Sequence, residues 1–180
     1  VAVGAQVTIH GNEKVGGIVG INRGSLGEAK ETYLTCQAKL VRAAQGTVGG
    51  IAGTTSGSIQ YAKNCAESVS ADAGYAGGIV AENTAGKTIA NCENHGNVTS
   101  SDGYAGGIAA LNEGTIADCS VSGTDAAMVT IQSRGTKEIG AVTAVNNGTI
   151  TASAAAGNVI LNGQAVIFGG ITGVNNGTVG

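Results

Sequence analysis

The chain has 180 residues, of which 32 are glycine, none is proline and only 3% are aromatic. Charged residues are scarce at 12%, and a net charge of -3 provides no basic patch, so nucleic acid is not expected as a partner. A hydrophobic share of 42% argues against disorder. All apolar runs are shorter than the roughly 20 residues needed to cross a bilayer, so no membrane insertion is expected. Residues 1–15 carry no signal-peptide pattern.

One glycine-rich apolar segment recurs along the chain. Its clearest copy is residues 105–116, Ala-Gly-Gly-Ile-Ala-Ala-Leu-Asn-Glu-Gly-Thr-Ile, and further copies begin at residues 15, 48, 76, 139 and 168. Consecutive copies start 28 to 34 residues apart, which is typical of a solenoid, whose repeats bury their apolar sides only against their neighbours. We therefore expect an all-β fold, a parallel β-solenoid of about six coils, in one domain over residues 1–180.

Three short strands are recognised in each coil. Alternating segments such as Gln6–His10 precede each glycine pair, the pair opens a second strand, and a Gly-Thr-Ile segment gives a third. Side chains alternate between the two faces of a strand, which places two aliphatic columns in the interior. The first column is Ile18, Ile51, Ile79, Ile108, Val142 and Ile171, and the second is Leu26, Ile59, Ile89, Ile116, Ile150 and Val179.

An asparagine column lies between these aliphatic columns. Its members are Asn22, Asn83, Asn112, Asn146 and Asn175, with Thr55 as the exception. A row of metal or sugar ligands is one interpretation. We favour a structural ladder, in which each amide bonds the copy above and satisfies buried turn groups.

The cysteines follow the coil period. Cys36, Cys65, Cys92 and Cys119 are separated by 29, 27 and 27 residues and contain no CxxC pair, so zinc is not indicated. Stacked cysteines can fill an interior as small hydrophobic residues, and we expect a reduced thiol stack. Because adjacent coils lie about 4.8 Å apart, one or two disulfides between coils are the alternative.

Strict alternation also defines a candidate contact face. It comprises Val19, Ile21, Val80, Leu111, Val145 and Val174, and Glu82 is the one charged residue in the same columns. A flat apolar face on a soluble protein often marks a contact surface, and the alternatives are cover by another segment or lateral packing of solenoids. The longer connections 27–47 and 120–138 are further candidates, and helix-like composition over residues 28–34 suggests a helical turn or loop.

No catalytic constellation is recognised. His10 and His95 have no partner at ligand spacing, the carboxylates are scattered, and no metal or cofactor is expected. A Ser/Thr column resembles the arrays of ice-binding solenoids, but only Thr149 and Thr151 form matching ranks. An enzyme, including one that degrades polysaccharides, and an ice-binding surface are therefore both disfavoured.

The recurring pattern Gly-Gly-Ile-x-(Gly/Ala)-x-Asn-x-Gly-(Ser/Thr)-Ile-x-x-Cys, clearest over residues 76–119, resembles the GLUG-type repeats of bacterial surface and secreted proteins. Such repeats are similar to those flanking functional domains in large adhesins and some immunoglobulin A proteases. The resemblance implies a right-handed parallel β-solenoid, export and a location outside the cell or on the bacterial surface. It carries over no catalytic or binding residue.

Together these patterns predict a non-catalytic extracellular repeat module that serves as adhesin, stalk or filament component. Expected partners are a protein or glycan surface, or a second copy stacked head to tail. Residues 176–180 stop partway through a coil, which suggests a fragment of a longer array or a stacking subunit, with residues 6–10 of another copy able to continue it. A carbohydrate-binding solenoid for mucin or other glycans is the alternative, although aromatic rings for sugar stacking are scarce.

Overall fold

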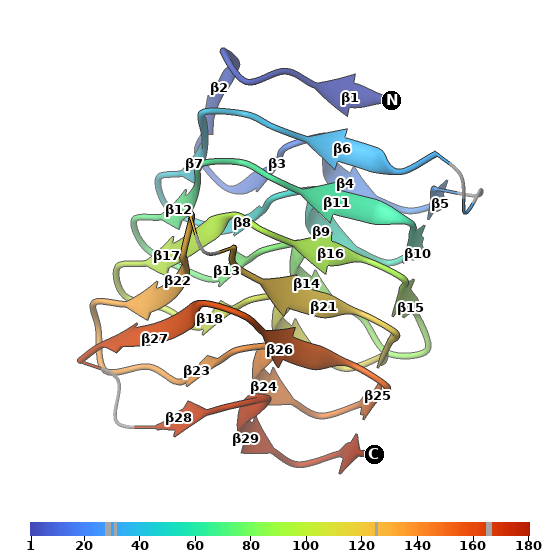
Figure 1. Cartoon of the computed structure of the whole chain (residues 1–180), viewed down its shortest axis with the longest axis vertical. Coiled ribbons are helices and arrows are strands. Elements are labelled where there is room, and N and C mark those ends of the chain that lie inside the picture. The colour runs from blue at the N-terminus through green and yellow to red at the C-terminus, as the bar shows by residue number, and fades with distance from the viewer. Residues whose placement is uncertain (28–29, 31, 125, 165–166) are drawn as a thin grey trace.

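The computed structural model describes residues 1–27, 30, 32–124, 126–164 and 167–180. These residues form an all-β solenoid without a helix, in which 30 short strands make five six-stranded parallel sheets. Each coil contributes one strand to every sheet, so coil one contains β1–β5 and coil six contains β26–β30. The N- and C-termini lie at opposite ends of the stack (Figure 1). The described residues include no helix long and apolar enough to span a membrane.

We name the sheets A to E in chain order. Sheet A contains β1 (Ala2–Val3), β6 (Leu34–Cys36), β11 (Ala62–Asn64), β16 (Glu93–Asn94), β21 (Ser120–Ser122) and β26 (Ala154–Ala156). Sheet B contains β2 (Thr8–Gly11), β7 (Leu40–Ala43), β12 (Ser68–Ala71), β17 (Asn97–Ser100), β22 (Val129–Ser133) and β27 (Val159–Gly163). Sheet C contains β3 (Lys14–Gly16), β8 (Thr47–Gly49), β13 (Ala76–Gly77), β18 (Ala105–Gly106), β23 (Ile139–Gly140) and β28 (Phe168–Gly169).

The last two sheets complete the coil. Sheet D contains β4 (Val19–Asn22), β9 (Ala52–Thr55), β14 (Val80–Asn83), β19 (Ala109–Asn112), β24 (Thr143–Asn146) and β29 (Thr172–Asn175). Sheet E contains β5 (Ser25–Leu26), β10 (Ser58–Gln60), β15 (Thr88–Ala90), β20 (Thr115–Ala117), β25 (Thr149–Thr151) and β30 (Thr178–Val179). The solenoid of about six coils is thus confirmed.

The expected three strands per coil are corrected to five. The glycine-pair segment is divided between sheets C and D, and the segment around the first cysteine forms sheet A. The division occurs because consecutive amides share one acceptor: the amides of Ile79 and Val80 both donate to the carbonyl of Ile108, at 2.9 and 3.0 Å. The same pairing recurs at the corresponding residues of coils one to five. The chain therefore bends sharply between sheets C and D.

Glycine is required on the sheet C side of this bend. A Cβ added to Gly106 would overlap the carbonyl oxygen of Ala109, and one added to Gly49 would overlap that of Ala52. Sheets C and D consequently pack with their backbones in direct contact, which only a residue without a side chain permits.

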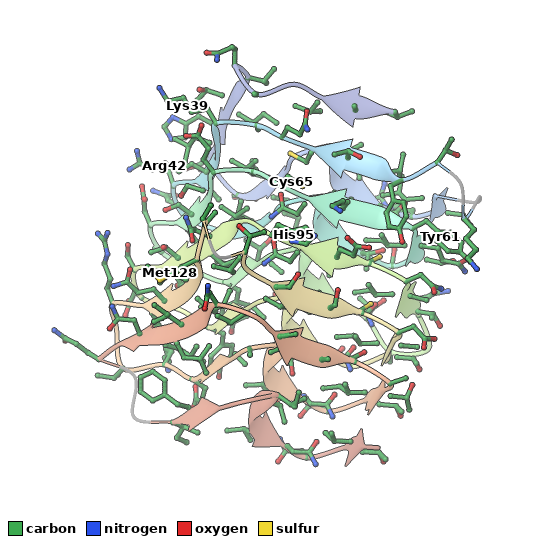
Figure 2. The ribbon with its side chains drawn as sticks, in the orientation of Figure 1. Lys39, Arg42, Tyr61, Cys65, His95 and Met128 are labelled. Carbon is green, nitrogen blue, oxygen red and sulfur yellow. The ribbon has the colours of Figure 1, made fainter. Side chains whose placement is uncertain are left out.

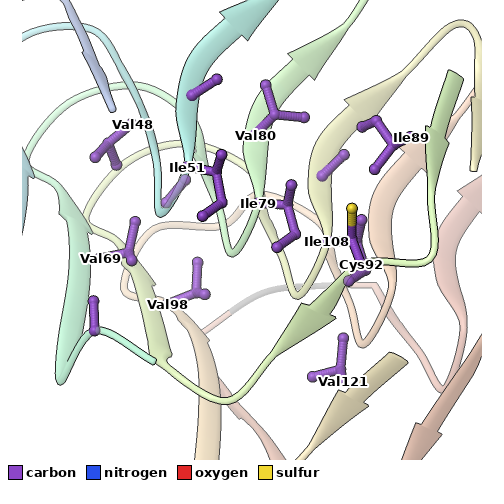
Figure 3. Close-up of a cluster of buried hydrophobic side chains, with 14 of the residues drawn as sticks. Val48, Ile51, Val69, Ile79, Val80, Ile89, Cys92, Val98, Ile108 and Val121 are labelled. Carbon is purple, nitrogen blue, oxygen red and sulfur yellow. The ribbon is translucent and has the colours of Figure 1, made fainter. Parts of the chain in front are cut away.

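The interior contains the expected aliphatic columns. Ile51, Ile79 and Ile108 are fully buried, as are Ile59, Ile89 and Ile116 of the second column. Figure 3 shows how the isoleucines of successive coils lie in a row, with Val69 and Val98 of sheet B and Val121 of sheet A around them. Aliphatic stacking at strand spacing thus replaces the large aromatic core of a globular domain.

Each of the two long connections contains strands of the solenoid. Residues 27–47 contain β6, β7 and the first residue of β8, and residues 120–138 contain β21 and β22. The helical turn or loop expected over residues 28–34 lies partly outside the described residues, which exclude 28, 29 and 31, and residue 34 begins β6. Of the described residues in the second connection, 123–124, 126–128 and 134–138 lie between strands, and residue 125 is not among those described.

Candidate functional surfaces

The asparagine column forms a hydrogen-bonded ladder between coils. The Nδ2 of Asn83 donates to the Oδ1 of Asn112, that of Asn112 to Asn146, and that of Asn146 to Asn175, each at 2.8 Å. Asn22 Nδ2 donates instead to Thr55 Oγ1 at 3.0 Å. The same amides also reach turn carbonyls, for example Asn112 Nδ2 to Gly114 O at 3.2 Å. The column therefore holds corners together, as expected.

The ladder is interrupted after Thr55. The Thr55 hydroxyl donates to Gly57 O at 2.9 Å, so it has no proton for the next coil. Accordingly, Asn83 Oδ1 is buried and has no hydrogen-bond partner among the described residues. Threonine closes its own turn but cannot act as donor and acceptor along the axis at the same time.

A second, shorter ladder lies in sheet A and was not anticipated. Asn64 Nδ2 donates to Asn94 Oδ1 at 2.8 Å, and both side chains are fully buried. Each Oδ1 also accepts from the amide two residues later, at Ala66 and Gly96. An asparagine recurring at one coil period just before a turn was the signal in the sequence that identifies it.

The cysteines do not form the expected four-membered stack. Cys92 and Cys119 occupy equivalent positions of adjacent coils, and each donates at 3.2 Å to the carbonyl two residues earlier. Cys36, in contrast, pairs with Asn64 in register, and Cys65 follows one residue later. All four cysteines are unpaired in the structure. The cysteines are nearly equally spaced in the sequence but do not share one column, because the segments that connect them to the preceding strands differ in length.

The candidate contact face is narrower than strict alternation suggests. Val80 is fully buried within the apolar core, and Val19, Leu111, Val145 and Val174 are half-buried. Ile21 alone is exposed, at 41%. At the bend, two consecutive residues of each coil share one carbonyl acceptor, and both lie against the interior. A pattern that alternates strictly between inside and outside, starting from the isoleucine column, therefore assigns Val19 and Val80 to the outer face, which is wrong.

Sheet A presents a polar cluster that bridges three coils. Lys63 Nζ lies 2.8 Å from Glu93 Oε2, which also lies 3.1 Å from His95 Nε2. His95 Nδ1 contacts the carbonyl oxygen of Ser122 at 2.9 Å. The hydrogen bond from Lys63 keeps the pKa of the Glu93 carboxyl below its usual value, against the opposing effect of burial. Figure 2 shows that His95 lies close to Cys65 on this face.

His95 thus has partners that linear spacing does not reveal. Glu93 is only two residues away, but Lys63 and Ser122 reach the cluster through the parallel register of sheet A. Cys65 is half-buried, and its pKa is raised by burial, which does not favour the thiolate that a nucleophile needs. The cluster is therefore a set of satisfied contacts between coils rather than a nucleophile with its base.

All four tyrosines occur in pairs. Tyr33 and Tyr61 meet edge to face with ring centroids 6.1 Å apart beside the polar cluster, and Tyr75 and Tyr104 stack at 4.7 Å at the start of sheet C. Every ring is half-exposed. The few aromatic residues are thus concentrated in two places, which raises their capacity to contact a flat ligand.

Among the hollows of the surface, two lie beside coil one. The first is a shallow depression of about 280 Å³ lined by His10, Gly11, Asn12 and Ala44, and His10 is exposed there. The second is a pocket of about 270 Å³ lined by Glu13, Lys14, Gln45, Gly46, Thr47 and Glu82. Only the second contains several converging polar side chains.

Within the described residues, no group of three or more His, Cys, Asp or Glu side chains is arranged to hold a metal ion. The arrangement defines a parallel β-solenoid whose polar interior groups serve mainly to join coils. No protein-family model, curated protein or solved structure matches the chain.

Proposed function

We propose that this chain is a non-catalytic repeat module of an extracellular or surface-located bacterial protein, where it acts as a stalk or as a filament component. One observation carries the proposal: all five sheets run through every coil in parallel register, so each coil presents to its neighbour a surface like its own. The interior columns and the Asn83–Asn175 ladder follow the same axis. Such a stack can extend by adding coils without new kinds of contact.

The bacterial surface location and the adhesin role rest on the resemblance to GLUG-type repeats together with this architecture. A stack with termini at opposite ends is suited to separating two points in space (Figure 1). Nearest-neighbour contacts also mean that a longer array keeps the same local stability.

Sedimentation velocity from about 1 to about 100 µM tests end-to-end stacking, because association by mass action grows with concentration. We expect long species, and we expect Asn175→Lys to abolish them by placing a charge on the last ladder position. Asp102→Lys, in an exposed turn away from both ends, is the matched control and should assemble normally. Oligomers that persist in Asn175→Lys would contradict end-to-end stacking, and a concentration-independent monomer would exclude the filament role.

Carbohydrate binding is the second candidate, favoured by the Tyr33–Tyr61 pair, of which Tyr33 lies near Glu93 and Lys63. Rings next to charged and polar groups are suited to stack on a sugar and bind its hydroxyl groups. A glycan and mucin screen tests this candidate. Binding that is lost in Tyr61→Ala but kept in Tyr104→Ala would support it, and an equal response of the two variants would refute a site at this pair.

A further inference from the structure

The pocket between coils one and three contains groups that the solenoid itself does not satisfy. Its walls come from three successive coils: Glu13 and Lys14, then residues 45–47, then Glu82. At about 270 Å³ it is near the lower limit for small-molecule sites, so it suits one narrow group or one sugar ring. The polar cluster on sheet A, in contrast, has its charges paired internally.

Glu82 is the central feature of this pocket. It lies in a column whose other members are Ile21, Thr54, Leu111, Val145 and Val174, so a carboxylate is not required there by the fold. Glu82 is half-buried and makes no hydrogen bond or ion pair with any described residue. Burial raises the pKa of this carboxyl, while nearby Lys14 opposes the shift and Glu113 adds to it. A partly desolvated, unpaired carboxylate in a concavity is a frequent mark of a binding site.

Thr47 provides a second unsatisfied group. Its Oγ1 is shielded from solvent and has no hydrogen-bond partner among the described residues. Thr47 lines the pocket directly, and it pairs in register with Lys14 of coil one. Rotation about χ1 would turn the hydroxyl towards the pocket, where a bound group could supply the partner that the protein lacks.

The charges around the pocket indicate the charge of the group that would bind there. Glu13 and Glu82 line it with Lys14 as the one cation, and Glu113 contributes a further negative charge to Glu82. A group that donates several hydrogen bonds and carries a positive charge would pair with Glu82 and satisfy the Thr47 hydroxyl. We propose that this pocket binds a primary ammonium group, carried either by an amino sugar or by a lysine side chain.

The test uses the full 180-residue chain labelled with 15N and titrated with three probes. The probes are glucosamine, N-acetylglucosamine, which keeps the ring but removes the charge, and N-α-acetyl-lysine methylamide. We expect the two amines to shift the amide signals of residues 13–14, 45–47 and 82, with N-acetylglucosamine at least about tenfold weaker. The tighter of the two amines identifies whether the source is a sugar or a protein.

Variants separate the pocket from general attraction of cations. Glu82→Gln should weaken amine binding at least about tenfold, and Thr47→Val should weaken it to a smaller extent. Glu67→Gln removes an exposed carboxylate elsewhere and is the matched control, which should bind as the native chain does. Leucine and valine occupy the Glu82 column in coils four and five, so Glu82→Gln should fold, and circular dichroism checks that it does. Equal affinity for N-acetylglucosamine, or unchanged binding by Glu82→Gln, would overturn the proposal.

Discussion

Replacing Thr55 by asparagine should stabilise the solenoid by completing its ladder. In the native chain Thr55 Oγ1 accepts from Asn22 Nδ2 at 3.0 Å and donates to Gly57 O at 2.9 Å, which leaves the buried Asn83 Oδ1 without a partner. An asparagine side chain provides two donors and an acceptor. It can accept from Asn22 and donate both to its own turn and to Asn83, as Asn112 does in coil four.

The magnitude follows from the group that becomes satisfied. A buried acceptor without a partner costs about 1–3 kcal/mol, and part of the gain is offset by ordering a longer side chain. We therefore expect a gain of about 1–2 kcal/mol, which for a chain of this size raises Tm by about 2–8 °C. Urea denaturation and calorimetry measure both quantities. The reverse change, Asn112→Thr, should remove the donor to Asn146 Oδ1, which then keeps only the Gly148 amide at 3.3 Å, and should lower stability. If Thr55→Asn were neutral or destabilising while Asn112→Thr had no effect, the account of the ladder as a donor–acceptor chain would be wrong.

Three further predictions concern the interior and sheet A. Asn112→Ala should cost about 3 kcal/mol, because it removes one hydrogen bond from each of the amides of Asn83 and Asn146 and the donor to the carbonyls of Gly114 and Thr149. The pKa of Glu93 is held low by the Lys63 hydrogen bond, so its contribution to stability is present above the usual glutamate pKa and disappears as pH falls through the lowered value. Glu93→Gln should flatten the dependence of the urea midpoint on pH in that range. Alkylation under native conditions should modify Cys65 first, since Cys92 is buried and its thiol pKa is raised well above the usual value by burial.

Each of these three predictions would be contradicted by a specific result. Asn175→Ala, at the exposed end of the ladder, serves as the control for Asn112→Ala, and equal losses would show that burial does not determine the cost. A pH profile of Glu93→Gln that matches the native chain would remove Glu93 from the acid response. Mass spectrometry that finds Cys92 modified before Cys65 would indicate opening of the coil rather than surface reactivity.

Periodicity in the sequence was sufficient to predict the solenoid, its interior isoleucine columns and the asparagine ladder. These features depend on contacts between identical positions of successive coils, so a column of like residues reports them directly. Asn112 and Asn146, for example, need only to recur beside a turn for each to find the other.

The candidate contact face was partly misassigned for a local backbone reason. The amides of Ile79 and Val80 share one acceptor, and a pattern that counts every second residue cannot register such an irregularity. Val80 was therefore assigned to the surface although it is fully buried. The division of each glycine-pair segment into two strands was missed for the same reason.

The cysteines show that spacing and register are different quantities. Cys92 and Cys119 each lie three residues after the isoleucine of sheet E, whereas Cys65 lies six after Ile59 and Cys36 ten after Leu26. Counted from the aliphatic residue of sheet E in each coil, only Cys92 and Cys119 lie at the same position. The cluster of Lys63, Glu93 and His95 was not visible because Lys63 and Ser122 reach Glu93 and His95 from the coils on either side.

The asparagine ladder also has a direction. In every link between described residues the amide nitrogen belongs to the coil nearer the N-terminus and the oxygen to the next coil. One end of each column therefore offers a donor and the other an acceptor. Two solenoids meeting through a two-fold axis would bring donor against donor or acceptor against acceptor, whereas a translated copy would pair correctly. Both ladders therefore disfavour two-fold pairing of coils, whereas the exposed amide pair beside the first ladder, Asn176 Nδ2 to Asn147 Oδ1, has the opposite direction.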